Sequence, residues 1–206
     1  MRTRSIILAG VTLFLTNLAS NANITSLSYW DDGDGGIVCP QYTWPGGDTV
    51  SIYGDQYFAP GHILFDVTTD SSGDPTLMLG NAIDNDTSFA WTSYEVDIWM
   101  SKTFTISAAN VSGPAGWGVD STVQPTGPQT AYQDGNPIPN QYIGHLYFSG
   151  TPAVAISDEL DFSYDITFTG SATFTEQLIP IPEPGTLSLV LCGALLLGGW
   201  TAGKRR

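Results

Sequence analysis

Apolar and polar residues alternate along much of this chain with a period of two. The clearest run is Leu160–Thr169, in which apolar and polar side chains take turns without a break. Tyr94–Met100 repeats the pattern and has Glu95 and Asp97 among its polar positions. Because successive side chains of a strand point to opposite faces, each run predicts a β-strand with one buried and one solvated face.

Six shorter runs predict further strands, and turn-forming residues separate them. Gly170-Ser171 between two runs predicts a two-residue hairpin. The Gly- and Pro-rich stretch Gly113–Pro139 predicts a long loop with at most one short strand. Eight or nine strands in all predict an all-β chain, folded as an antiparallel β-sandwich or jelly roll. The shorter runs are Thr49–Tyr53, His62–Thr68, Thr76–Gly80, Phe104–Ala108, Tyr142–Ser149 and Ala172–Leu178.

The first 22 residues have the composition of a secretory signal peptide. Arg2 and Arg4 precede the apolar run Ile6–Leu15, and small residues follow up to Ala22. We expect cleavage after Ala22. The alternative is an uncleaved membrane anchor, but the run is shorter than the roughly 20 residues of a spanning helix.

The other end of the chain has three parts: a Pro-Glu-Pro motif, an apolar stretch and a basic tail. The apolar stretch, Leu187–Gly203, has 17 residues and no charge. That length is at the lower edge of the range for a transmembrane helix. The basic tail favours the cytoplasmic side of a membrane. The motif is Pro182, Glu183 and Pro184, and the tail is Lys204, Arg205 and Arg206.

In order and spacing, these three parts resemble the PEP-CTERM sorting signal. The resemblance implies a chain from an exopolysaccharide-producing Gram-negative bacterium, exported by its secretion machinery and processed by a membrane-bound exosortase. Residues 187–203 then anchor the chain only transiently, before it reaches the cell surface or extracellular matrix. The alternative is an ordinary tail anchor that stays in the membrane. The resemblance covers residues 182–206 and implies nothing about the body, residues 23–181.

The body is strongly acidic. Lys102 is its one basic residue against 19 acidic residues, a net charge of −18. Such a domain repels nucleic acid, and it repels anionic polysaccharide unless divalent cations bridge the two. Apolar residues make up 42% of the whole chain, which argues against disorder. Cys39 is alone in the body, so stability must come from a packed core.

Two short stretches concentrate carboxylates and predict possible calcium sites. Asp31, Asp32 and Asp34 lie in one Gly-rich stretch, and Asp84 and Asp86 lie in another. Calcium takes six to eight oxygen ligands, which mobile acidic loops can supply. Neither stretch matches an EF-hand. The alternative is a pair of solvated turns, because Asp and Gly are also favoured turn residues. We expect no other cofactor.

Glu95-Val96-Asp97 resembles the Glu-x-Asp-x-x-Glu strand of laminarinase-like glycoside hydrolases. In that family two carboxylates on one strand face act as nucleophile and general acid/base. Here Met100 stands where the second Glu belongs. The chain also lacks the motifs of serine hydrolases, zinc proteases and phosphate-binding loops. We therefore expect no enzymatic activity, with a degenerate glycoside hydrolase as an alternative.

Exposed aromatic rings are a third possible source of function, because flat rings stack on sugars. Trp99 shares a strand face with Glu95 and Asp97, so its ring is predicted to be exposed. Trp30 and Trp44 lie near loops. A carbohydrate-binding module is thus one alternative, although most tryptophans of a small domain fill its core. Our first expectation is a structural or adhesive protein of an extracellular polysaccharide layer.

Overall fold

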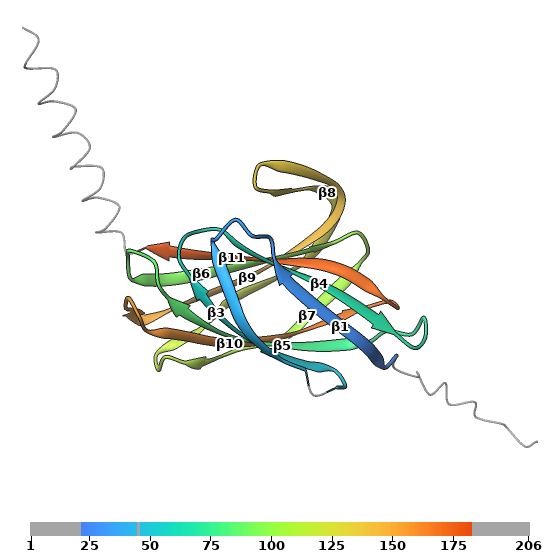
Figure 1. Cartoon of the computed structure of the whole chain (residues 1–206), viewed down its shortest axis with the longest axis horizontal. Helices are drawn as coiled ribbons and strands as arrows, with labels where there is room; N and C mark the ends of the chain where they lie inside the picture. The colour runs from blue at the N-terminus through green and yellow to red at the C-terminus, as the bar shows by residue number, and fades with distance from the viewer. Residues whose placement is uncertain (1–21, 45, 183–206) are drawn as a thin grey trace, which may run out of the picture.

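The computed structural model describes residues 22–44 and 46–182, which form two β-sheets packed face to face (Figure 1). The six-stranded sheet has the order β1 (Ile24–Asp31), β4 (Gly61–Thr69), β11 (Ala172–Pro182), β6 (Trp91–Met100), β9 (Asn136–Val154) and β8 (Trp117–Gln133). The five-stranded sheet has the order β2 (Ile37–Thr43), β3 (Thr49–Gln56), β5 (Thr76–Asn85), β10 (Glu159–Phe168) and β7 (Phe104–Gly113).

The all-β sandwich predicted from the alternation is confirmed. Strand pairs are antiparallel except β3 and β5, which run parallel. The described residues form eleven strands, so the estimate of eight or nine was too low. No helix within 22–44 and 46–182 is long and apolar enough to cross a membrane. The predicted signal peptide up to residue 21, and Glu183, Pro184 and the basic tail, lie outside the described residues.

The core lies between the two sheets and consists of the residues that alternation assigned to the buried face. Tyr94, Phe162 and Ile166 are among those that are almost completely buried. Phe65 of β4 stacks on Phe174 of β11, with ring centroids 4.6 Å apart. Each such buried side chain contributes roughly 1.5–3 kcal/mol to stability. Ala108 is an exception, because it has a φ of 51° beside a register shift and its side chain is exposed.

The predicted hairpin at Gly170-Ser171 is wrong. The turn carries the chain from β10 in one sheet to β11 in the other, so the two strands do not pair. Phe168 and Phe174, on either side of this turn, meet across the interior with ring centroids 6.3 Å apart. The apolar faces of two successive strands can be buried by facing each other, and alternation alone does not distinguish this arrangement from a hairpin.

The predicted long loop at Gly113–Pro139 is also wrong. It contains β8 and the start of β9, which pair with each other. Most side chains of β8 are exposed on both faces, so its sequence lacks the alternation of a half-buried strand. Asp134 and Gly135 connect the two strands, and their φ values of 51° and 75° belong to a tight hairpin turn. An Asp-Gly pair is a strong hairpin signal, and Asp134-Gly135 is the feature of the sequence that indicates this hairpin.

The tip of this hairpin, residues 126–141, extends past the sheet, and we call it the arm. β9 pairs with β6 only from Tyr142 onward, so no further strand of the described residues lies beside the arm. Figure 1 shows the hairpin curling back over the outer side of the six-stranded sheet. Gln133 of the arm donates a hydrogen bond of 3.3 Å from Nε2 to Oδ2 of Asp32, and Ala131 is buried. The arm therefore covers part of a sheet face that would otherwise be open to solvent.

Candidate metal centre

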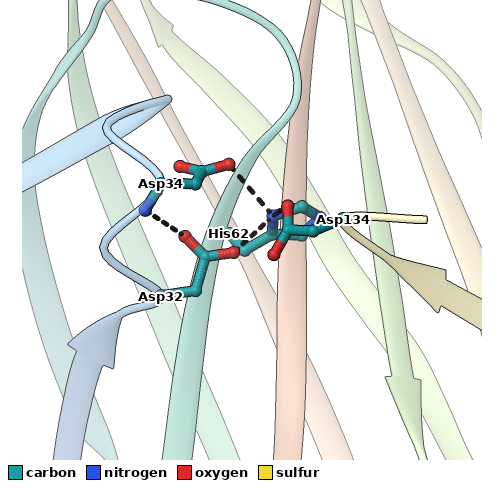
Figure 2. A group of neighbouring side chains, drawn as sticks. All are labelled: Asp32, Asp34, His62 and Asp134. Atoms are coloured by element: carbon teal, nitrogen blue, oxygen red, sulfur yellow. Dashed lines mark hydrogen bonds and ion pairs between the residues drawn. The ribbon is translucent and has the colours of Figure 1, made fainter. Parts of the chain in front are cut away.

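Three carboxylates converge on one histidine where the arm meets the sheet (Figure 2). Asp32 and Asp34 come from the loop after β1, His62 from β4, and Asp134 from the tip of the arm. One ligand atom from each lies within 4.8 Å of the others. Segments about 30 and 100 residues apart in sequence thus build one cluster.

The loop after β1 holds its carboxylates through short-range hydrogen bonds. The backbone N–H of Asp34 donates to Oδ1 of Asp32, and the N–H of Gly36 donates to Oδ1 of Asp34. Each Asp is thereby held in a turn that Asp and Gly favour. In both residues the other oxygen, Oδ2, is the atom that faces His62.

His62 is the buried centre of the cluster. Its side chain is 0% exposed, and its Nδ1 lies 2.8 Å from Oδ2 of Asp32, 3.9 Å from Oδ2 of Asp34 and 3.7 Å from Oδ1 of Asp134. Among the described residues, neither ring nitrogen has a partner in hydrogen-bond geometry, and the short contact to Asp32 does not have that geometry either. A buried polar nitrogen without a hydrogen bond is costly. Its Nδ1 therefore faces three carboxylates within ion-pair distance but makes no hydrogen bond to any of them.

Asp134 reaches the cluster because of the turn in which it lies. Asp tolerates positive φ better than most residues, and Gly135 follows at no steric cost. The side chain of Asp134 is 42% exposed, against 7% for Asp32 and 23% for Asp34. It is therefore the solvent-facing member of the group.

The two loop carboxylates have opposite pKa shifts. Burial acts to raise the pKa of Asp32, but hydrogen bonds and the charge of His62 lower it overall. Burial raises the pKa of Asp34, and the charges of Asp32 and Asp134 raise it further. The carboxylates thus repel one another, and a bound cation would relieve this repulsion.

The donor set is one imidazole nitrogen and three carboxylates. Nitrogen ligands suit zinc and the divalent transition metals, whereas calcium prefers oxygen ligands alone. The residues present therefore fit a zinc- or manganese-type ion better than the calcium ion expected from the acidic stretch. Asp134 and His62 were missed as candidate ligands because they are far from that stretch in sequence.

The other predicted metal ligands do not join this cluster. Asp31 accepts a hydrogen bond from the N–H of Gly33 and is not part of the group. Asp84 and Asp86 lie at the five-stranded sheet, and neither belongs to any three-residue cluster among the described residues. Burial raises the pKa of Asp55, and the charges of Asp84 and Asp86 raise it further. The two Asp-rich stretches look alike in sequence, but in the structure only the first contributes carboxylates to a cluster with a histidine.

A second group contains the other histidine and is internally satisfied. Nδ1 of His145 lies 2.6 Å from Oδ1 of Asp97 and 3.7 Å from Oε1 of Glu95. The hydrogen bond to Asp97 raises the pKa of His145 above its usual value. Burial and a hydrogen bond to Glu95 raise the pKa of Tyr147 to about 12. These partners account for the polar atoms that face one another, so the group needs no ion.

The structure separates the residues of the hydrolase-like motif. Glu95 and Asp97 lie on the outer face of the six-stranded sheet, while Met100 is buried in the core. Among the described residues, the carboxylate close to Glu95 is that of Asp97, already part of the motif. The position of the second Glu thus points away from the other two.

The three candidate tryptophans have different surroundings. Trp99 is 3% exposed, which overturns the expectation of an exposed ring. It lies on the outer sheet face as predicted, but it lines a groove together with residues of the arm. The ring of His62 lies edge-on to it, with the two ring centroids 6.0 Å apart. Trp30 is 45% exposed. Trp44 packs partly against the core and donates to the carbonyl of Gly47.

The chain matches no protein-family model, and no curated protein matches it in sequence.

Proposed function

We propose that this protein is an exported β-sandwich that binds one divalent metal ion through Asp32, Asp34, His62 and Asp134. The observation that carries the proposal is Nδ1 of His62, which is fully buried, makes no hydrogen bond to the described residues and is surrounded by carboxylate oxygens from two distant segments. Nδ1 and one oxygen from each carboxylate supply four protein ligands, the number that structural zinc sites use.

The ion is proposed to fasten the arm to the sheet. Asp134 is the arm's ligand, and Asp32, Asp34 and His62 belong to the sheet and its loop. Without an ion, two polar contacts join the arm to the sheet here: the hydrogen bond from Gln133 to Asp32 and the 3.7 Å contact between Asp134 and His62. Metal binding is coupled to structure whenever the ligands come from separate segments.

We further propose that the domain acts at the cell surface or in the extracellular matrix as a structural or adhesive component. The PEP-CTERM-like tail and the signal peptide support this location, and the charge of −18 suits a domain that meets divalent cations outside the cell. β11 ends at Pro182, so a processing cut beyond Pro182 leaves the last strand intact. Exosortase and the export machinery are the proposed processing partners.

The N-terminal junction also suits cleavage after Ala22. The backbone N–H of Asn23 donates to Oδ1 of Asp70 at 2.9 Å, and its side-chain amide donates to Oδ2 at 2.8 Å. A new ammonium group on Asn23 would face this carboxylate. Intact-mass measurement of the protein from its host should show a chain that begins at Asn23 and has lost the C-terminal apolar stretch, residues 187–203. Recovery of the full-length chain from membranes would contradict this processing.

Calorimetric titration tests the metal centre. Purified protein stripped with a chelator is titrated with zinc, manganese and calcium in turn. We expect one ion per chain, with zinc or manganese bound more tightly than calcium. Asn adopts the same turn as Asp, so Asp134→Asn should leave the backbone of the arm unchanged. Because the substitution removes a ligand itself, it should weaken metal binding by at least about 100-fold, the upper end of the loss seen when only a hydrogen-bond partner of a ligand is removed.

A matched control lies on the other sheet. The double variant Asp84→Asn/Asp86→Asn removes two carboxylates from the acidic turn that has no histidine, and it should leave the affinity unchanged. Equal loss of affinity in both variants would mean that the acidic surface attracts cations without a defined centre. No binding of any of the three ions would overturn the proposal.

A further inference from the structure

We infer that the groove between the arm and the six-stranded sheet binds an uncharged saccharide chain, and that metal at the arm tip keeps this groove formed. The groove has a volume of about 370 Å³, within the roughly 300–1,000 Å³ typical of small-molecule sites. The metal dependence rests on the proposed metal centre, whereas the binding surface itself stands on its own residues.

The groove floor is a row of polar side chains across three neighbouring strands. Gln177 of β11 is opposite Asp97 of β6, and Asp97 is opposite His145 of β9. Adjacent strands are about 4.8 Å apart, so the row presents hydrogen-bonding groups at regular short intervals. All three residues line the groove.

Part of this row is available to a ligand. His145 uses Nδ1 for Asp97 and has no partner on Nε2 within the described part of the chain. The side-chain amide of Gln177 likewise has no hydrogen bond to the residues described. An amide offers both donors and an acceptor, and a neutral imidazole nitrogen offers one or the other.

Apolar groups lie on both sides of the polar row. Trp99 and Ile143 flank it on one side and Ile179 on the other. The arm supplies the roof, in which Ala131 is buried and the ring of Tyr132 is 62% exposed. Aromatic rings usually fill the core of a small domain, so a ring this exposed beside a groove is available for stacking on a ligand.

This combination fits a saccharide in particular. A sugar ring has hydroxyl groups around its edge and apolar C–H groups on its faces, so it needs alternating hydrogen-bonding and flat apolar surfaces. A lipid would leave the side-chain amide of Gln177 and Nε2 of His145 unpaired, which is costly in a covered groove.

The charge of the groove argues for an uncharged sugar. Asp97 lines the groove and Glu95 lies beside it, while the one Lys of the body, Lys102, is engaged with the carbonyls of Thr169 and Ser171. Within residues 22–44 and 46–182, no Lys or Arg is therefore present in the groove to recognise a carboxylate, sulfate or phosphate group. Anionic polysaccharides are expected to be excluded.

Affinity electrophoresis tests the inference. Purified protein with bound metal is run through native gels that contain dextran, galactomannan, hydroxyethyl cellulose or alginate. We expect retardation by at least one of the three uncharged polymers and none by alginate. Gln177→Ala and Tyr132→Ala should each weaken binding about tenfold without changing the metal affinity or the melting temperature. The double variant Asp84→Asn/Asp86→Asn should bind as the natural protein does.

The outcomes separate the groove from the metal centre. Retardation that is lost in Gln177→Ala and in Tyr132→Ala supports the groove. Retardation that also falls after chelation and in Asp134→Asn supports the metal dependence, and retardation insensitive to both overturns the metal dependence alone. Absence of retardation in all three uncharged gels, with metal bound, overturns the groove, as does retardation that neither groove variant reduces.

Discussion

The outer faces of the two sheets are both acidic, yet they differ in how their acids are arranged. On the five-stranded sheet, Asp55, Asp84 and Glu159 form a row across β3, β5 and β10. Burial and then the neighbouring carboxylates raise the pKa of Asp55 and of Glu159. On the six-stranded sheet two groups of acids surround His62 and His145, the two histidines of the chain, and the arm covers part of the face.

The difference shows that several carboxylates close together do not by themselves make a metal centre. Both Asp-rich stretches have the composition of a cation site, but only one of them receives a buried nitrogen and a third carboxylate from elsewhere in the chain. The acids on the five-stranded sheet remain a solvated, mutually repelling row.

The largest effect on the free energy of unfolding is expected at Glu176, which lies in the core between the two sheets. Its side chain is fully buried and accepts hydrogen bonds from Asn81 and Tyr164 of the five-stranded sheet. Burial raises its pKa to about 7. Between pH 4.5 and 7 the folded protein therefore holds a proton that the unfolded chain releases, so stability falls by about 3 kcal/mol as the pH rises through this window.

Glu176→Gln should remove this pH dependence and stabilise the protein above pH 7. Urea unfolding at a series of pH values measures it, provided that metal is absent throughout. If the slope persisted in Glu176→Gln, the pH dependence would instead come from the acids of the outer faces.

Metal should stabilise the protein only through the centre on the six-stranded sheet. At a free metal concentration 100 times the dissociation constant, the free energy of unfolding should rise by about 2.7 kcal/mol. His62→Ala should abolish the increase, while Asp84→Asn/Asp86→Asn should retain it in full. Chemical denaturation with and without zinc measures the change, and an increase that survives in His62→Ala would contradict the proposed centre.

A smaller effect is expected on the arm itself. Without metal, Asp134 still lies 3.7 Å from Nδ1 of His62, but it is partly solvated, so this contact is worth about 1 kcal/mol or less. Hydrogen exchange of residues 126–141 should accelerate modestly in metal-free Asp134→Asn, while exchange in β10 stays unchanged. Acceleration spread evenly over both sheets would mean that the variant had lost general stability.

The smallest effect is expected on the five-stranded sheet. Asp84→Asn removes one source of repulsion, so the pKa of Asp55 should fall toward its usual value, and stability should change by no more than about 0.5 kcal/mol. A titration followed by NMR of the Asp55 carboxyl group measures the shift. A large loss of stability would show that Asp84 has a structural partner, which its surroundings in the sheet do not suggest.

Local sequence patterns predicted the parts of the fold in which one face of a strand is buried. The alternating residues of β6 and β10 are buried as expected, because burial on one face of a strand leaves a period of two in the sequence. β8 was missed because both of its faces are largely exposed, and such a strand leaves no period. The turn at Gly170-Ser171 was misassigned because alternation specifies which side is buried but not which sheet the strand joins.

The sequence by itself determined the β-sandwich class, the acidic body and the two carboxylates of the loop after β1. Those features depend on composition and on residues a few positions apart. The tertiary structure alone decided that His62 and Asp134 join Asp32 and Asp34, that Trp99 is covered, and that Asp84 and Asp86 stay apart. These outcomes depend on strand order and on where the arm folds back. Both arise from contacts between distant segments, which spacing along the chain does not encode.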